Sequence, residues 1–463
     1  MIRLFNAYFP ARTLLLGMSE AFLVTLGFTT SIVLWFGLMD ADLMLWYERG
    51  FIKIFAISAI FIVCMYYFDL YDTLVLGNRR EVLTRLIQVL GTSCLILAGL
   101  YVAYPWLRIG YSVFLSGLVL VGISIALLRR LFLLLNHLPR FSERMLVVGD
   151  GALTQSLFTE VEKRKELGVQ LVGCVSDRDG GAGSGRLPAI GRIDQLEDVI
   201  EKEQVKRIVV AMTERRGKLP IESLLKLKMK GVVIQDGAEF FETVTGKISL
   251  DSLRLSWLLF SPGFRISRVM SVYKRGLSIF LALVGIIITL PLMALVAICV
   301  RLDSDGPAIF RQERIGKDGK IFTLYKFRSM RQGSDKGGKH IPAMEADDRI
   351  TRVGGYLRRL RLDELPQLFN ILRGDMYFVG PRPFVPDQES DLAEKIPFYS
   401  QRWAVKPGAT GWAQINRGYC ASLEDNQEKL AFDLFYIKNM SIGLDLLILF
   451  QTVKILLLGR GGR

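Results

Sequence analysis

Two adjacent carboxylates in an arginine-rich stretch are the side chains best suited to chemistry in this sequence. Residues 351–372 read TRVGGYLRRLRLDELPQLFNIL, so a run of arginines leads to Asp363 and Glu364. Neighbouring residues on a helix point about 100° apart, which lets two carboxylates serve different atoms of one reaction centre. A carboxylate can attack phosphorus to form an acyl phosphate if a divalent cation or arginines neutralise the opposing charge. On spacing alone, Asp363 as a helix N-cap is the favoured hypothesis, and the catalytic one stays open at this point.

The composition indicates a membrane protein with anionic partners. Of the 463 residues, 51% are hydrophobic, which is more than a purely soluble protein of ordinary composition needs. The formal net charge of +14 fits nucleic acid, anionic lipid or a phosphorylated substrate, and charge alone does not choose among them. With two histidines in the whole chain, a His-ligated metal or a Ser-His-Asp triad has little material. We therefore expect carboxylate chemistry.

Four apolar stretches open the chain, at about residues 13–38, 51–68, 85–104 and 111–135, and each approaches the length of a membrane-spanning helix. The loop after the first stretch is mostly acidic, whereas the next loop and the two flanks are basic. By the positive-inside rule, both ends of this bundle face the cytoplasm. We predict a four-helix transmembrane bundle over residues 1–143. Glu20 lies inside the first span, where we expect a contact within the bundle or an interfacial position rather than a transport role.

Residues 144–236 are predicted to form a small, doubly wound, Rossmann-like α/β domain. An apolar run from Met145 leads into Gly149-Asp150-Gly151, which is typical of a buried strand, a glycine turn and a helix. Further apolar runs near residues 170–175, 207–212 and 232–235 are predicted strands. Thr154 stands where a dinucleotide fingerprint has its third glycine, so a regulatory or structural role is favoured over cofactor binding. We expect a connector over residues 237–271.

A fifth apolar stretch, residues 276–300, is long enough to cross the membrane. The basic segment that begins at Arg301 resists translocation, and Pro291 removes a backbone hydrogen bond and can kink a helix. We therefore favour a re-entrant helix with a break at Pro291 over a fifth span. Residues 441–458 suit a helix in the membrane interface, with Asp445 on its polar face, and a core helix is the alternative.

Six motifs follow one another in the C-terminal part: GPAIFRQERIG (306–316), YKFRSM (325–330), LDELPQ (362–367), GDM (374–376), VGPRP (379–383) and KPGATGWAQI (406–415). From about Lys274 onward the chain resembles the bacterial sugar transferases, which are polyprenyl-phosphate glycosyl-1-phosphate transferases of the monotopic phosphoglycosyl transferase superfamily. Its four spans and α/β domain are similar to the large members, the undecaprenyl-phosphate glucose or galactose phosphotransferases. Some features resemble the branch associated with exosortase-type exopolysaccharide loci. The collinear motifs favour a catalytic role for Asp363 over the structural one.

The resemblance implies a two-step displacement. Asp363 would attack the β-phosphate of a UDP-sugar and release UMP, and polyprenyl phosphate would then take the phosphosugar from the enzyme. Glu364 would activate the acceptor or hold magnesium, and Asp363 and Glu364 are the expected Mg²⁺ ligands because this ion prefers carboxylate and phosphate oxygens.

Four basic residues are candidates for binding the substrate. Arg358 and Arg382 are the first candidates for the diphosphate, since arginine grips phosphate through a planar fork. Lys326 and Arg328 are second candidates. The alternative for each of the four residues is a surface charge near anionic lipid.

These inferences predict a C-terminal α/β catalytic domain over residues 272–463, at the cytoplasmic face of a bacterial inner membrane. The expected partners are a UDP-sugar, polyprenyl phosphate and membrane lipid, in the first step of exopolysaccharide or O-antigen assembly, with homo-oligomerisation left open. Nucleic acid is not expected, because no groove-reading motif is present. One alternative is a membrane-anchored NAD-dependent sugar dehydratase, which needs a Tyr-x-x-x-Lys pair, although no tyrosine lies between Tyr111 and Tyr273. A second alternative is a non-enzymatic scaffold or polysaccharide transport component.

Overall fold

The computed structural model describes residues 1–72, 79–136, 142–164, 167–176, 188–212, 219–250, 253, 255–261, 263–265, 267–333, 347–418 and 422–458. The chain divides into two compact units, of which the first holds residues 1–2 and 9–240 and the second residues 3–8 and 241–463. The boundaries predicted at residues 143, 236 and 271 stay predictions.

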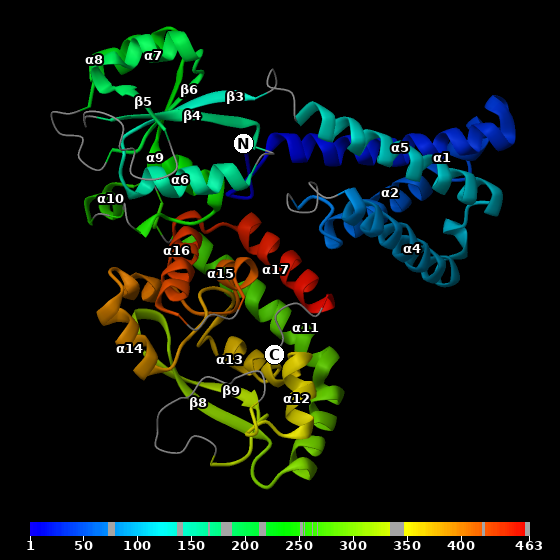
Figure 1. The fold of residues 1–463 in the computed structure, drawn as a ribbon. Helices are drawn as coiled ribbons and strands as arrows, with labels where there is room; N and C mark the ends of the chain where they lie inside the picture. The colour runs from blue at the N-terminus through cyan, green and yellow to red at the C-terminus, as the bar shows by residue number, and fades with distance from the viewer. Residues whose placement is uncertain are drawn as a thin grey trace. The chain divides into compact units, whose positions relative to one another are not determined.

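The first unit begins with four long apolar helices, coloured blue to cyan in Figure 1. They are α1 (Ala11–Trp46), α2 (Gly50–Tyr67), α4 (Arg79–Ala103) and α5 (Tyr111–Asn136), with the short helix η1 (Pro105–Leu107) before α5. All four are long and apolar enough to cross a membrane, which confirms the predicted candidate spans. The helix α1 packs against α2 and α5, and Phe28, Phe61 and Val121 lie in their shared core. At Gly37, where φ is 73°, the backbone of α1 leaves the helical conformation.

Glu20 makes a contact inside this bundle, one of the two places expected for it. Its Oε1 lies 2.6 Å from Nε of Arg129, and both side chains are buried. Arg129 also donates a hydrogen bond to the carbonyl oxygen of Leu70 at 2.8 Å. The pair therefore joins α1 to α5 and to the end of α2.

Replacing Arg129 with leucine is expected to lower the stability of the bundle by about 1–2 kcal/mol, because Glu20 then stays buried without its cation. Thermal unfolding in detergent measures this effect. The double variant Glu20→Gln/Arg129→Leu should regain part of the loss, and equal melting temperatures for Arg129→Leu and the wild type would contradict a role for this pair.

The rest of the first unit is a five-stranded parallel sheet in the order β5-β4-β3-β6-β7. Its strands are β3 (Glu143–Val148), β4 (Val169–Ser176), β5 (Ala189–Arg192), β6 (Arg207–Val210) and β7 (Val233–Asp236), and its helices are α6 (Ala152–Lys163), η4 (Ile193–Gln195), α7 (Leu196–Glu203) and α8 (Ile221–Met229). Alternate residues such as Leu146 and Ile208 pack under α7 and α8, and α6 lies on the other face (Figure 1). This topology confirms the predicted parallel α/β sheet, although β5 was not foreseen.

From residue 237 onward the described chain forms many helices and two small sheets rather than one central sheet. In chain order its elements are α9 (Gly237–Thr245, which begins in the first unit), α10 (Leu255–Phe260), α11 (Arg268–Asp303), β8 (Ile309–Ile315), η6 (Lys317–Gly319), β9 (Ile321–Phe327), α12 (Arg352–Arg359), η7 (Leu362–Glu364), α13 (Gln367–Arg373), β10 (Tyr377–Val379), α14 (Pro386–Lys395), η8 (Tyr399–Ala404), β11 (Gly408–Thr410), α15 (Trp412–Asn416), α16 (Leu423–Asn439) and α17 (Ile442–Leu457). The strands β8 and β9 pair antiparallel, whereas β10 and β11 pair parallel. The predicted α/β character of this part is thus limited to two two-stranded sheets among the described residues.

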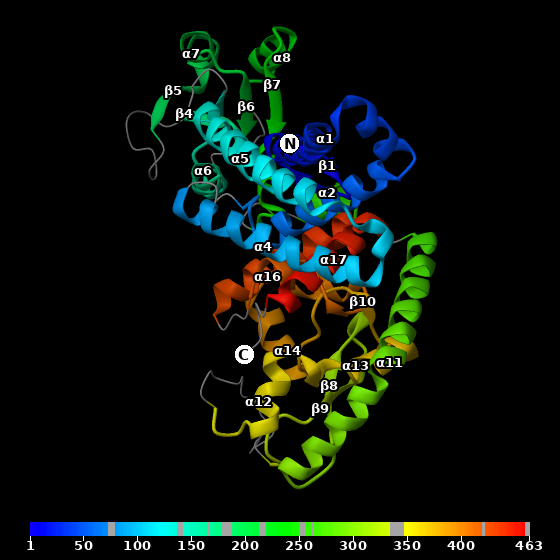
Figure 2. The same ribbon diagram turned by 90° about the vertical axis from the view of Figure 1, so that its right-hand side faces the viewer.

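The helix α11 runs without interruption through Pro291, so the predicted break is not visible as a gap in the helix. It lies along the second unit beside α13 and α12 (Figure 2). Near its start Ser278 accepts a hydrogen bond from the backbone N–H of Phe378, and near its end Met293 and Val300 pack against Phe327. Its outer side is apolar and exposed, for example at Ile287. Helix α11 is therefore attached to one domain from Ser278 to Val300.

The C-terminal helix α17 has one buried and one exposed apolar side. Leu444 and Ile448 are buried, while Leu446 and Phe450 are exposed, which fits both a core contact and an apolar surface. Contrary to the prediction, Asp445 does not lie on a polar face. It is buried, and its carboxylate lies 2.8 Å from Nζ of Lys274 in α11. The spacing misled because the charge that neutralises Asp445 is about 170 residues away.

A short N-terminal hairpin, formed by β1 (Ile2–Leu4) and β2 (Ala7–Phe9), packs on the junction between α16 and α17. Arg3 Nη2 donates to Asn439 Oδ1 at 3.0 Å, and Asn6 Nδ2 donates to the carbonyl oxygen of Asn439 at 3.0 Å. Phe5 covers Gly443, where an added Cβ would lie 2.5 Å from the Phe5 ring. Residues 3–8, which come before α1 in the chain, thus belong to the second unit.

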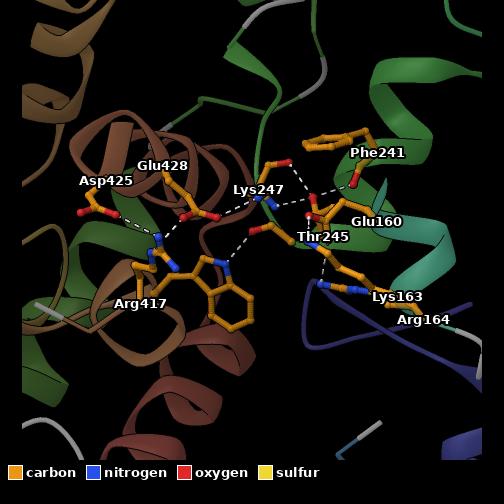
Figure 3. Close-up of polar contacts among 11 residues, drawn as sticks. Glu160, Lys163, Arg164, Phe241, Thr245, Lys247, Arg417, Asp425 and Glu428 are labelled. Carbon is orange, nitrogen blue, oxygen red and sulfur yellow. Dashed lines mark hydrogen bonds and ion pairs between the residues drawn. The ribbon is translucent and has the colours of Figure 1, made fainter. Parts of the chain in front are cut away.

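The predicted connector also packs on α16 (Figure 3). Nζ of Lys247 lies 2.9 Å from Oε1 of Glu428, and Arg417 approaches the same carboxylate from its other oxygen at 2.9 Å. The indole N–H of Trp412 donates to the carbonyl oxygen of Gly246 at 2.8 Å. These contacts attach the segment at Gly246 and Lys247 to the C-terminal part of the chain.

Candidate active site

The hairpin of β8 and β9 and the helix α13 bring the predicted site together. Asn370 of α13 is fully buried and accepts a hydrogen bond from the backbone N–H of Tyr325 at 3.0 Å. Its amide nitrogen donates to the carbonyl oxygen of Thr323 at 2.7 Å. These bonds hold β9 against α13, and Lys326 of β9 faces Glu364, which lies just before α13.

Asp363 and Glu364 lie in the short helix η7 and not at the start of α13. Asp363 makes no capping hydrogen bond, and α13 begins after Pro366, so the N-cap hypothesis is wrong. The reason is Arg361, whose φ of 55° places it in the left-handed region and turns the chain before the two carboxylates. A non-glycine residue held in this region next to a candidate site is typical of strained functional backbone.

Three cations surround Glu364. Lys326 Nζ and Arg382 Nη2 each lie 3.1 Å from its Oε1, and Arg361 Nη1 lies 3.5 Å from its Oε2. Burial opposes ionisation of Glu364, but Lys326 first, and then Arg382 and Arg361, outweigh burial and lower the pKa of this carboxyl. The lowered pKa favours the ionised form of Glu364, and this carboxylate binds three cations at the site.

Asp363 has the opposite environment. Among the described residues it has no hydrogen bond or ion pair, and burial, together with the charge of Glu364, raises its pKa despite Lys326 and Arg358 nearby. Nη1 of Arg358 is buried and has no hydrogen-bond partner in the described part of the chain. Two neighbouring carboxyl groups whose environments move their pKa values apart usually have different roles. Asp363 is the one whose oxygens are available to a ligand.

The structure places Arg328 apart from this cluster. Its guanidinium is buried and donates to the carbonyl oxygens of Ser304 at 2.6 Å and Asp305 at 2.7 Å, after the end of α11. These contacts favour a structural role for Arg328, whereas Lys326, Arg358 and Arg382 all lie near the two carboxylates.

Sequence reasoning missed two residues of the site, Arg314 and Asn370. Burial first and Arg382 second lower the pKa of Arg314 to about 10, while Glu364 acts in the opposite direction, so Arg314 belongs to the same cluster. Its Nη1 donates to the carbonyl oxygen of Pro383 at 3.1 Å, and its Nε is buried without a partner among the described residues. Arg314 stands in the GPAIFRQERIG motif, whereas Asn370 lies between the LDELPQ and GDM motifs, so motif membership could have pointed only to Arg314.

The donor set fits magnesium in part. Mg²⁺ usually binds one or two carboxylates and keeps water or phosphate oxygens as its other ligands. Asp363 offers such an oxygen, whereas Glu364 is already engaged by three cations. No group of three His, Cys, Asp or Glu side chains that could hold a metal occurs in the described ranges. A magnesium ion here would therefore depend on Asp363 and on the phosphates of a substrate.

Comparison with known proteins decides the family. A family model described as "Bacterial sugar transferase" matches residues 269–459. The chain is 35% identical over 325 residues to the UDP-glucose:undecaprenyl-phosphate glucose-1-phosphate transferase of Escherichia coli (strain K12), which covers 69% of this chain and 68% of that protein. This chain belongs to the bacterial sugar transferase family.

Two further relatives agree with this membership. This sugar transferase is 32% identical over 365 residues to the enzyme of the same name from Xanthomonas campestris pv. campestris, covering 73% of this chain and 72% of the relative. It is 44% identical over 225 residues to the UDP-N-acetylgalactosamine-undecaprenyl-phosphate N-acetylgalactosaminephosphotransferase of Aeromonas hydrophila, covering 48% of this chain and 52%, about half, of that relative. A second family model, described as "CoA-binding domain", matches residues 66–227 of this sugar transferase, which include α5 and the sheet strands up to β6.

Proposed function

We propose that this sugar transferase moves a sugar 1-phosphate from a UDP-sugar to polyprenyl phosphate through a covalent intermediate on Asp363. The observation that carries the proposal is the Asp363 carboxyl, which has no partner within the described part of the chain, beside the anion Glu364, which binds three cations. The names of the relatives support a donor of this class and undecaprenyl phosphate as acceptor.

In the first step an oxygen of Asp363 attacks the β-phosphorus. The bond between this phosphorus and the bridging oxygen breaks, and UMP leaves with the electron pair. In the second step an oxygen of polyprenyl phosphate attacks the same phosphorus, the bond to Asp363 breaks, and the carboxylate is regenerated. Arg382, Arg314 and Arg358 would neutralise the charge on the phosphoryl oxygens, since such fixed cations stabilise transferring phosphoryl groups.

Glu364 is assigned a positioning role in this proposal rather than that of a general base. A base works best when its pKa lies near the working pH, and the cations around Glu364 lower its pKa far below that. The acceptor phosphate is largely ionised near neutral pH, because the second pKa of a phosphate monoester is about 6. Bound magnesium would add positive charge at the phosphates, with Asp363 as its available ligand.

The reaction is tested by measuring UMP release from UDP-glucose, UDP-galactose and UDP-N-acetylgalactosamine with purified protein, magnesium and undecaprenyl phosphate in nanodiscs. The expected result is release that depends on the acceptor and prefers one donor. A folded protein that is inactive on every donor would favour the scaffold or transport hypothesis. The proposal extends to the first step of exopolysaccharide or O-antigen assembly, while homo-oligomerisation stays a prediction.

Activity is expected to fall on acidification at a higher pH than an ordinary aspartate would cause. Asp363 must be ionised to attack, and burial raises its pKa above the usual value of about 3.9. Single-turnover UMP release across the acid range measures the apparent pKa of this step. An apparent pKa at or below the ordinary aspartate value would contradict either the assignment of Asp363 as the nucleophile or the effect of burial on its pKa.

We also propose that the catalytic part lies on the cytoplasmic side and that α11 does not cross the bilayer. Contacts of α11 with a single domain from Ser278 to Val300 support this, because a complete span would carry one end away from that domain. The N-terminal hairpin supports it independently. Residues 3–8 belong to the second unit. The chain that connects them to the rest of this unit must therefore cross the membrane an even number of times, and four spans satisfy this condition.

Cysteine labelling tests this topology. In a variant without native cysteines, Val272→Cys and Leu302→Cys would report on the two ends of α11, which are 73% and 82% exposed. Neither is expected to react with an impermeant maleimide added to intact spheroplasts, and both should react after lysis. Labelling of Leu302→Cys from outside would establish a fifth crossing.

A further inference from the structure

The short segment that carries Arg382, residues 381–384, is held at each of its four carbonyl oxygens. Every one of these oxygens accepts a hydrogen bond, and the donors come from the separate elements β8, η8 and β11. The donors are the backbone N–H of Gly408 for Pro381 (2.9 Å), Arg402 Nη2 for Arg382 (3.0 Å), Arg314 Nη1 for Pro383 (3.1 Å) and the backbone N–H of Ile315 for Phe384 (3.2 Å). Four successive peptide groups are thus fixed, and the bond at Arg382 itself comes from a side chain.

The two prolines on either side leave the backbone of Arg382 little freedom. A proline fixes its own φ angle and restricts the residue before it to extended conformations. With its carbonyl oxygen held by Arg402, Arg382 moves mainly by rotation of its side chain. That side chain is 40% exposed, and its Nη2 lies 3.1 Å from Oε1 of Glu364. The backbone therefore decides whether this guanidinium reaches the catalytic carboxylates.

Arg402 is a buried cation with carboxylates on both of its arms. Its Nη2 lies 2.8 Å from Asp433, and its Nη1 lies 3.4 Å from Glu389 and donates to the hydroxyl of Tyr399 at 2.6 Å. Both carboxylates are buried too, and the ring of Phe384 lies 4.8 Å from the guanidinium carbon. Buried ions add little stability compared with apolar groups of the same volume, whereas the fork of an arginine imposes a geometry.

We propose that Arg402 is a positioning residue for the transfer, which acts through the backbone carbonyl of Arg382 and does not touch the substrate. The inference rests on the proposed function, because it requires that Arg382 neutralise the transferring phosphoryl group. A lysine keeps the buried positive charge, but its single nitrogen cannot stand where the two guanidinium nitrogens bind Tyr399 and Arg382. Arg402→Lys therefore separates the effect of position from the effect of charge.

The test is a double-variant cycle measured by single-turnover UMP release. Arg402→Lys should slow the release by about 10- to 100-fold, because a small displacement of a group at the reaction centre is costly. If this loss arises at Arg382, it disappears when that guanidinium is already absent, so Arg382→Ala/Arg402→Lys should react within about 3-fold of Arg382→Ala. The matched control is Arg328→Lys, since Arg328 is also buried and binds carbonyl oxygens after α11. Any loss that it causes should be equal in both backgrounds.

Equal losses from Arg402→Lys in the two backgrounds, or no loss in the wild type, would overturn the inference. If Arg402→Lys does not fold, Asp433→Asn replaces it, because Asp433 binds the same Nη2, and the same non-additive result is expected.

A wild type that releases no UMP would overturn the proposed function instead. The positioning is then measured by the rate at which phenylglyoxal modifies Arg382, followed by mass spectrometry. Because the ion pair with Glu364 protects this guanidinium, modification should be faster in Arg402→Lys and in Glu364→Gln than in the wild type and in Arg328→Lys. An unchanged rate in Arg402→Lys would show that Arg402 does not position Arg382.

Discussion

Replacing Asp363 with asparagine is expected to reduce UMP release by at least about 10³-fold, because an amide oxygen cannot displace UMP and form the acyl phosphate. Mass spectrometry of the wild type, quenched after mixing with UDP-sugar and no acceptor, should detect the phosphosugar on the peptide that contains Asp363. The variant should show no such adduct. An active variant, or an adduct at another residue, would assign the nucleophile elsewhere.

Stability supplies the control for this substitution. In the folded protein burial raises the pKa of Asp363 above its unfolded value, so ionisation of this side chain opposes folding at neutral pH, and the penalty disappears as pH falls through the raised pKa. The asparagine variant carries no such penalty and should melt at the same temperature as the wild type or higher at pH 7. If the asparagine variant is inactive and also melts at a lower temperature than the wild type, unfolding would explain the loss of activity. Glu364→Gln is the matched variant, and it should keep the adduct but form it more slowly.

Replacing Lys274 with methionine is expected to destabilise the second unit by about 3–5 kcal/mol, because it leaves Asp445 buried without its cation. Lys274 Nζ lies 2.8 Å from Asp445 and donates to the carbonyl oxygen of Val379 at 3.0 Å, and it also binds the hydroxyl of Tyr436. It thereby joins α11 to α16, α17 and the strand that precedes Arg382. Chemical denaturation in detergent, followed by tryptophan fluorescence, measures the effect.

The double variant Lys274→Met/Asp445→Leu separates the two contributions to this loss. Removing both charges should recover much of the stability, because the penalty arises from the orphaned carboxylate rather than from the missing pair. A single variant that loses less than about 1 kcal/mol would mean that water reaches Asp445 and that the pair does not hold α11.

The family could be predicted from the sequence because its motifs are local. The motif that contains Asp363 and Glu364 and the collinear motifs around it identify the family that the comparisons confirm, whereas the catalytic role of the two carboxylates stays a prediction. The four apolar stretches and the parallel sheet were predictable for the same reason, since hydrophobic periodicity is a local property.

What could not be predicted depends on contacts between distant residues. Asn370 lies 45 residues from Tyr325, whose backbone it fixes, and no spacing rule connects them. Arg328 and Lys326 are two residues apart and equally basic, yet Lys326 faces Glu364 while Arg328 binds the chain after α11. The helix N-cap expected at Asp363 failed because Arg361 takes a left-handed conformation that its residue type does not favour.

The N-terminal hairpin has a consequence for the order in which the chain can assemble. Arg3 and Asn439 are 436 residues apart, so at a synthesis rate of about 5–20 residues per second the hairpin waits roughly 20–90 s for its binding site. Membrane insertion of the helices that follow it must be completed while residues 3–8 are still without their partners. The contact therefore closes last, and an affinity tag joined directly to this hairpin would interfere with the final step of assembly rather than with the insertion of the helices.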